Sequence, residues 1–155
     1  MNVQISSKFM PALMAIVAIT AGALVNYAGD RLLGIRLELF WGVSTFSPLW
    51  SLDLFVVPFI AGMVVSMIYG LGGKLLCYFA PILVRGISYI QMANYEGLPD
   101  GVTLLPLGYW VLILIVAVEA AAFGGVFGEI LIKKVYGRQP KHLLYKQSSG
   151  SSSKK

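Results

Sequence analysis

Cysteine, histidine and charged residues are all scarce in this sequence. Its 155 residues include one cysteine, Cys77, and one histidine, His142. An intrachain disulfide framework, a bis-histidine haem and a four-ligand structural zinc site are therefore excluded. Only 12% of the residues are charged, whereas about 25% is usual for a soluble domain. A water-soluble globule is thereby excluded, and so is disorder except near the end of the sequence.

Motifs of known catalytic chemistry are also missing. The sequence has no H-E-x-x-H, G-x-S-x-G or C-x-x-C. The glycine-rich run 70–74 ends in Lys74, but its spacing differs from that of a phosphate loop and no Ser or Thr follows. We therefore expect no catalytic residues, no metal ligands and no cofactor, and we do not expect an enzyme.

Long apolar runs are what the sequence does contain, with 57% hydrophobic residues and a mean hydropathy of +0.78. A helix that crosses the hydrocarbon layer needs about 20 mainly apolar residues. The sequence therefore predicts an all-α, polytopic integral membrane protein, a bundle of four transmembrane helices in one domain, 1–136. The expected spans are 10–28, 54–73, 75–93 and 106–132.

Two of these spans have alternative interpretations. The third contains Pro81 and Arg85, so it is either a full crossing or a re-entrant or tilted segment. At the first, Lys8 is followed by an apolar run from Phe9 to Thr20 and then by Ala21-Gly22-Ala23, a pattern typical of a cleaved signal peptide. Because the apolar run continues through Val25 to spanning length, an uncleaved first helix is preferred over removal of residues 1–23 as a signal peptide, which would leave three spans.

Basic residues are distributed very unequally between the two sides of this four-span arrangement. Nine Lys or Arg residues fall on the side of the two termini and only Arg31 and Arg36 fall on the other. Short loops that remain in the cytoplasm carry an excess of Lys and Arg. We therefore expect both termini to be cytoplasmic, in a bacterial inner (plasma) membrane or one of the same polarity.

The connection 29–51 on the outer side is unusually apolar. Apolar residues alternate with others from Leu33 to Leu39, which favours an extended segment packed at the membrane interface. Ser47-Pro48 predicts a turn. The connection either covers the helix ends or closes over a cavity, and the first interpretation is preferred.

The segment 137–155 is basic and polar, and we expect it to be a disordered cytoplasmic tail. Besides setting topology, it could bind anionic lipid, at roughly 1 kcal/mol for each basic residue near the surface. Binding to nucleic acid is not expected.

Small residues recur at four-residue spacing in the second and fourth spans, as they do at Ala18 and Gly22 in the first. Such rows lie on one helix face and allow another backbone to approach closely. They predict a tightly packed bundle, with partners in the same chain or in another. The candidate packing face comprises Gly62, Ser66, Gly70, Ala120, Gly124 and Gly128.

Most ionisable residues have an ordinary structural explanation. Asp53 lies near the expected start of the second span, where Ser51 could cap the helix and the helix dipole favours a carboxylate. Glu129 precedes Lys133 by four residues, which predicts an ion pair at the interface. The remaining acidic residues, Asp30 and Glu38 among them, are assigned to the outer surface.

Arg85 and Glu119 are the two ionisable residues deep within the expected spans. A rise of about 1.5 Å per residue places them at depths that differ by about 5 Å, which an arginine side chain can bridge. Charged groups inside a membrane usually find partners in the bundle. We therefore expect an intramembrane polar pair, Arg85 with Glu119, which either fixes the register of two helices or forms a site for an anion, a proton or a substrate.

A non-catalytic accessory or assembly subunit of a larger membrane protein complex is the function that these features favour. Its expected partners are the lipid bilayer and other membrane protein subunits or further copies of itself. The alternative is a small transporter or channel subunit with a polar path at Arg85 and Glu119.

Overall fold

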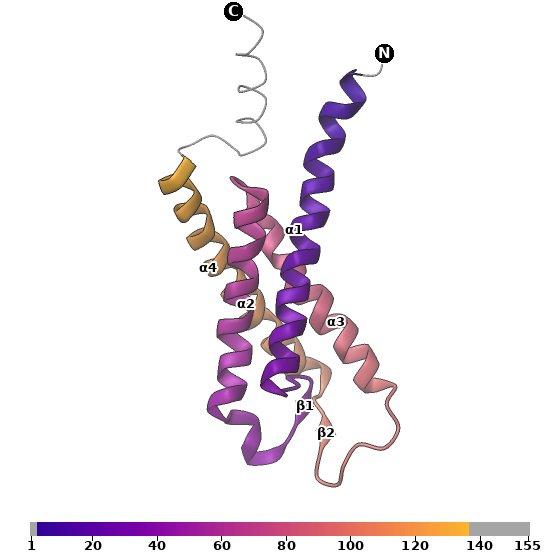
Figure 1. Ribbon diagram of the computed structural model, residues 1–155. Helices are drawn as coiled ribbons and strands as arrows, with labels where there is room; N and C mark the ends of the chain where they lie inside the picture. Colours follow the sequence, from indigo (N-terminus) through magenta and orange to yellow (C-terminus); the bar gives the residue numbers. More distant parts are fainter. Residues whose placement is uncertain (1–2, 137–155) are drawn as a thin grey trace, which may run out of the picture.

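The structure is a computed structural model that describes the backbone of residues 3–136 and the side chains of residues 10–135. The segment 137–155, where a disordered tail is expected, lies outside the described residues. In chain order the elements are α1 (Val3–Leu33), β1 (Leu39–Phe40), the 3-10 helix η1 (Gly42–Phe46), α2 (Pro48–Tyr69), the 3-10 helix η2 (Gly73–Tyr78), α3 (Phe79–Ala93), β2 (Thr103–Leu104) and α4 (Leu107–Tyr136) (Figure 1).

Four helical segments in this part of the chain are long and apolar enough to cross a membrane, as expected. They are Met10–Leu33, Pro48–Tyr69, Gly73–Ala93 and Leu107–Val135. The first runs five residues beyond the expected end at 28, and the second begins six residues before the expected start at 54. Asp30 and Asp53 therefore lie inside helices rather than at their borders.

The third segment combines two kinds of helix. The 3-10 helix η2 leads directly into α3, so that Pro81 is the third residue of α3. In the first turn of a helix the missing proline N–H removes no internal hydrogen bond. Pro81 therefore begins this helix rather than interrupting it.

The first residues of α1 and the last residues of α4 lie at one end of the bundle (Figure 1). The opposite end, which we call the loop end, carries the connections 34–47 and 94–106. There β1 and β2 form a two-residue antiparallel ladder, with Leu39 opposite Leu104. The extended segment is shorter than the alternation over 33–39 predicts, because α1 continues to Leu33 and a turn, closed by a hydrogen bond from the Leu39 N–H to the Arg36 carbonyl, precedes β1.

Ser47 rather than Ser51 caps α2. Its side chain accepts a hydrogen bond from the Trp50 N–H, and Pro48 is the first helical residue. The expected turn at Ser47-Pro48 is thus present, but the expected cap at Ser51 is wrong. Asp53 is consequently the sixth residue of α2 and lies beyond its first turn.

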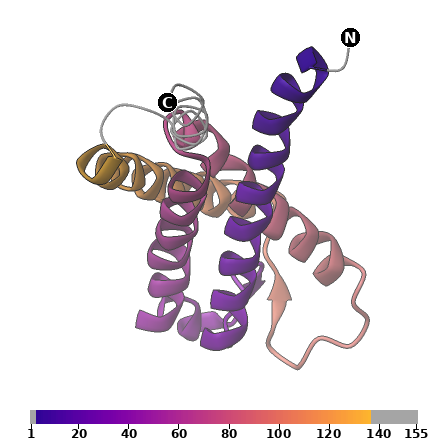
Figure 2. The same cartoon turned by 45° about the horizontal axis from the view of Figure 1, so that its top comes forward.

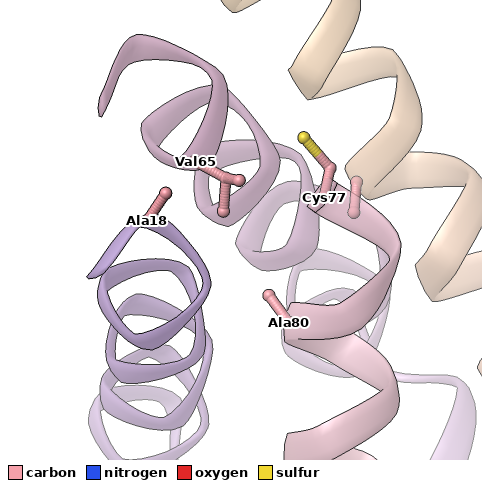
Figure 3. Packing of buried hydrophobic residues seen from close by; sticks show 5 residues of the cluster. Ala18, Val65, Cys77 and Ala80 are labelled. Carbon is pink, nitrogen blue, oxygen red and sulfur yellow. The ribbon is translucent and has the colours of Figure 1, made fainter. Parts of the chain in front are cut away.

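The helices α1 and α2 lie side by side in both views (Figures 1 and 2). The third segment packs against them, since Ala18 of α1, Val65 of α2, Cys77 of η2 and Ala80 of α3 meet in one fully buried cluster (Figure 3). The Cys77 thiol donates to the carbonyl oxygens of Gly62 and Gly73 at 3.1 and 3.2 Å.

The closest backbone approach is between α2 and α4. A Cβ on Gly62 would overlap the carbonyl oxygen of Ala121, and a Cβ on Gly124 would overlap that of Phe59. A Cβ on Gly128 would lie 2.8 Å from the Met63 oxygen. Small residues at these positions therefore permit the two helices to pack within one chain.

The other members of the expected packing face behave in different ways. Ser66 is buried in the same α2–α4 contact, where its Cβ lies 3.0 Å from the position that a Cβ on Gly128 would take. Ala120 is only half-buried, and its neighbour Ala121 makes the contact. Gly70 ends α2 with a φ of 94°, a conformation that favours glycine.

Candidate functional site

A buried arginine on α3 organises the polar interior of the bundle. The Arg85 side chain is 1% exposed, and its Nη1 and Nη2 donate to Oδ2 and Oδ1 of Asp30 at 3.0 and 2.7 Å. Nη1 also donates to Glu38 Oε1 at 3.5 Å, and Nη2 donates to Asp53 Oδ2 at 3.2 Å. We call these four residues the arginine cluster.

The helix boundaries explain why these carboxyls meet. Asp30 lies in the last turn of α1, Asp53 in the second turn of α2, and Glu38 directly before β1. All three positions are near the loop end, and Asp30 is about 5 Å from the end of α1 at 1.5 Å per residue. The cluster therefore joins α1, α2, α3 and the connection 34–47 at one end of the bundle.

The cluster is closed to solvent except at one member. Glu38 and Asp53 are 1% and 0% exposed, whereas the Asp30 side chain is 14% exposed. All ion pairs of the described residues involve Arg85. Three carboxyls thus share a single guanidinium, and the cluster has more acidic groups than basic ones.

Buried polar atoms without a hydrogen-bond partner gather around this cluster. In the described part of the chain they belong to Asn26, Glu38, Trp50, Asp53 and Arg85. Asn26 precedes Asp30 by four residues and Trp50 precedes Asp53 by three, and such spacings place residues on one helix face. Unused hydrogen-bonding capacity is therefore concentrated at the loop end of the bundle.

The structure does not bring Arg85 and Glu119 together. Glu119 is exposed on α4, and no described residue forms an ion pair with it. The depth count alone could not detect this, because it ignores the direction in which a side chain leaves its helix. Ala117 and Ala121, which flank Glu119 at two residues on either side, are the fully buried positions.

Sequence reasoning missed the actual partners of Arg85. It assigned Asp30 and Glu38 to the outer surface and Asp53 to the first turn of a helix. One signal was available: a buried arginine needs an acidic partner, and Asp30 and Asp53 border the apolar runs. Placing them inside the helices required the true ends of α1 and α2, which hydropathy does not define.

Glu129 has a different partner from the one expected. Its Oε1 accepts hydrogen bonds from the backbone N–H groups of Gly72 and Lys74 at 2.9 and 3.2 Å, and the residue is 7% exposed. No ion pair with Lys133 is formed among the described residues. The carboxylate instead holds the start of η2 against α4.

A cavity of about 550 Å³ opens at the loop end between Phe46, Trp50, Leu105 and Tyr109. Its walls are largely apolar, and no charged residue lines it. Within residues 3–136 no group of His, Cys, Asp or Glu side chains has a geometry that could hold a metal ion.

Comparisons with protein-family models, with curated proteins and with solved structures found no match. The function is therefore inferred from the geometry of this chain.

Proposed function

We propose that this chain is a non-catalytic accessory or assembly subunit of a larger membrane protein complex. The observation that carries the proposal is the exposed carboxyl of Glu119 in the middle of α4. It follows Leu107 by 12 residues and precedes Val135 by 16, or about 18 and 24 Å along the helix axis.

A carboxyl in this position is costly in lipid. A charged residue at the centre of a membrane helix costs roughly 2.5–3.5 kcal/mol even on the lenient insertion scale. Such residues normally face a protein partner or a water-filled cavity. A transmembrane helix of another subunit that offers a basic or hydrogen-bond-donating side chain at the same depth would remove this cost.

The surroundings of Glu119 fit a helix-docking surface. Five apolar residues of α4 that lie four, seven or eleven positions from Glu119 are exposed on the same side of the helix, whereas Ala117, Ala121, Gly124 and Gly128 on the opposite side are buried. We call the exposed row the Glu119 stripe; it consists of Leu112, Ile115, Glu119, Phe123, Val126 and Ile130.

We also propose a membrane for this chain and an orientation within it. The excess of basic residues around the two ends of the chain supports cytoplasmic termini in a bacterial inner membrane. The loop end, with the arginine cluster, then lies on the outer side, and the Glu119 stripe faces the surrounding bilayer or its partner.

Purification in mild detergent tests this function. We expect the wild-type chain to elute with different subunits in a constant ratio, and Glu119→Leu to reduce that ratio at least about tenfold. Glu96→Leu is the matched control, because Glu96 is also exposed but lies outside the four spans. Elution of the wild type alone or only with copies of itself, or full retention of partners by Glu119→Leu, would contradict the proposal.

A small transporter or channel subunit is the second candidate, and the arginine cluster favours it. Buried ionisable groups in transmembrane helices often mark ion or proton pathways. A path at Arg85 would depend on the carboxyls of α1, α2 and the connection 34–47, since Glu119 lies on the outside of the bundle. Flux in liposomes that contain only this chain, and loss of that flux in Asp53→Asn, would favour this function over the first.

A further inference from the structure

A groove of about 240 Å³ runs between α1 and α3. The two helices approach closely at Gly22, where an added Cβ would lie 3.2 Å from that of Ala80. They are joined again near the loop end by the ion pair of Asp30 with Arg85. Among the described residues, only those of α1 and α3 line the groove.

The groove changes in character along its length. Tyr27 and Gln91 line it nearest to the loop end, since α1 ends six residues after Tyr27 and α3 ends two residues after Gln91. Leu24 and Ile87 line it further into the apolar segments, and they are 62% and 56% exposed. The groove therefore offers polar groups at its outer end and an open apolar surface further in.

Arg31 lies at the polar end of this groove. Its guanidinium carbon is 5.2 Å from the centre of the Tyr27 ring, and its Nε donates to the Tyr27 hydroxyl at 3.1 Å. Arg31 is exposed, and no described acidic side chain forms an ion pair with it, because the neighbouring Asp30 is paired with Arg85. The two terminal nitrogens of Arg31 can therefore make a charged, two-point contact with an anion.

The length of the groove matches one leaflet of a bilayer. Arg31 follows Thr20, the deepest groove residue of α1, by 11 residues, or about 16 Å along the helix axis. Half of a hydrocarbon layer is about 15 Å thick. The hydroxyls of Thr20 and Ser88 can bond to carbonyl oxygens of their own helices, so they do not require a polar ligand. A molecule that fills the groove from Arg31 inward would therefore have an anionic head group and an apolar chain.

We propose that this groove binds one phospholipid, with its phosphate on Arg31 and an acyl chain between α1 and α3. An arginine guanidinium matches two oxygens of a phosphate, and the contact with Tyr27 orients the guanidinium. The exposed amide of Gln91 can donate to an ester oxygen of the same lipid. The site rests on the proposed membrane location of the chain and is independent of the Glu119 stripe on α4.

Native mass spectrometry of the full chain in mild detergent, with added dioleoyl phosphatidylglycerol, tests the contact with phosphate. We expect one lipid to bind the wild type, and Arg31→Gln to weaken this binding at least about fivefold. Dioleoylglycerol, which has the same chains and no phosphate, should bind the wild type as weakly as phosphatidylglycerol binds Arg31→Gln. Arg31→Lys should retain most of the affinity. Arg36→Gln is the matched control, because Arg36 also lies at the loop end but, among the described residues, only Arg31 stacks on a ring of the groove.

A second pair of variants tests the position of the acyl chain. Ile87→Trp places a larger side chain in the groove and should abolish lipid binding. Ile90→Trp is its control, since Ile90 is 63% exposed on the same helix but does not line the groove. Because Arg31→Gln and Ile87→Trp are independent, failure of one to fold leaves the other as a test.

Unchanged lipid binding in either Arg31→Gln or Ile87→Trp would overturn the proposal. So would a polypeptide that elutes with the wild type and is lost in Ile87→Trp, because a helix of another subunit would then occupy the groove. We expect both variants to keep the subunits that depend on Glu119. Failure of the lipid site and failure of the docking role are therefore distinguishable.

Discussion

Arg85 of α3 holds both carboxylate oxygens of Asp30, which lies 55 residues earlier in the last turn of α1. This contact joins the two helices at the loop end, where Asp53 of α2 and Glu38 of the connection 34–47 meet the same guanidinium. The ion pair between Arg85 and Asp30 therefore links the first apolar segment to the third, whereas the sequence predicted a link between the third and the fourth.

Loss of the ion pair between Arg85 and Asp30 should destabilise the bundle. Removal of one partner from a buried ion pair costs roughly 3–5 kcal/mol in soluble proteins, because the other charge stays buried. We expect Arg85→Ala to lower the free energy of unfolding by a similar amount, measured by titration with a denaturing detergent in mixed micelles.

Double-mutant cycles distinguish the two candidate partners of Arg85. The effects of changing Arg85 and Asp30 should be strongly coupled, whereas the effects of changing Arg85 and Glu119 should be additive within about 0.5 kcal/mol. Equal coupling in both cycles would refute the contact with Asp30.

The close approach of α2 and α4 gives a second prediction. A Cβ at position 124 would overlap the carbonyl oxygen of Phe59, whereas a Cβ at position 86 of α3 would meet no atom within 4 Å. Gly124→Ala should therefore destabilise the bundle by about 1–3 kcal/mol through overpacking. Gly86→Ala should be neutral or stabilise it by roughly 0.5–1 kcal/mol, since alanine favours helix. Thermal unfolding of the two variants in one detergent measures the difference, and similar melting temperatures would show that α2 and α4 do not pack this way.

Glu129 should stabilise the end of the bundle where η2 begins. Its truncation in Glu129→Ala leaves the N–H groups of Gly72 and Lys74 without their acceptor, at a cost of about 1–3 kcal/mol. Lys133→Ala is the control, and we expect it to change the free energy of unfolding by less than about 1 kcal/mol. An equal loss in both variants would instead support the ion pair between Glu129 and Lys133.

Topology reporters test the orientation in the membrane. A reporter placed at Gly97, in the connection between α3 and α4, should be active only if it works outside the cytoplasm. One fused after Lys155 should be active only if it works in the cytoplasm. If the two reporters instead prove to lie on the same side of the membrane, the segment Gly73–Ala93 does not cross fully.

Hydropathy was sufficient for the four apolar helices, because a helix in lipid needs a long apolar run whatever it packs against. Glycine spacing likewise located Gly62 and Gly124 on the α2–α4 contact. The partners of Arg85 could not be found in this way. They depend on where α1 and α2 end and on the connection 34–47 folding Glu38 back into the bundle, and neither is visible in a depth count. Glu119 shows the same limit, since two residues along a helix separate a buried face from an exposed one.

Cross-linking from the Glu119 stripe tests the central claim most directly, that this chain docks to another membrane protein through α4. A photoreactive amino acid in place of Phe123, one turn from Glu119 and 70% exposed, should form one reproducible adduct with a different polypeptide in native membranes. The same adduct should disappear when Glu119→Leu is added. Adducts with lipid alone, or a polypeptide adduct that Glu119→Leu leaves unchanged, would contradict the claim.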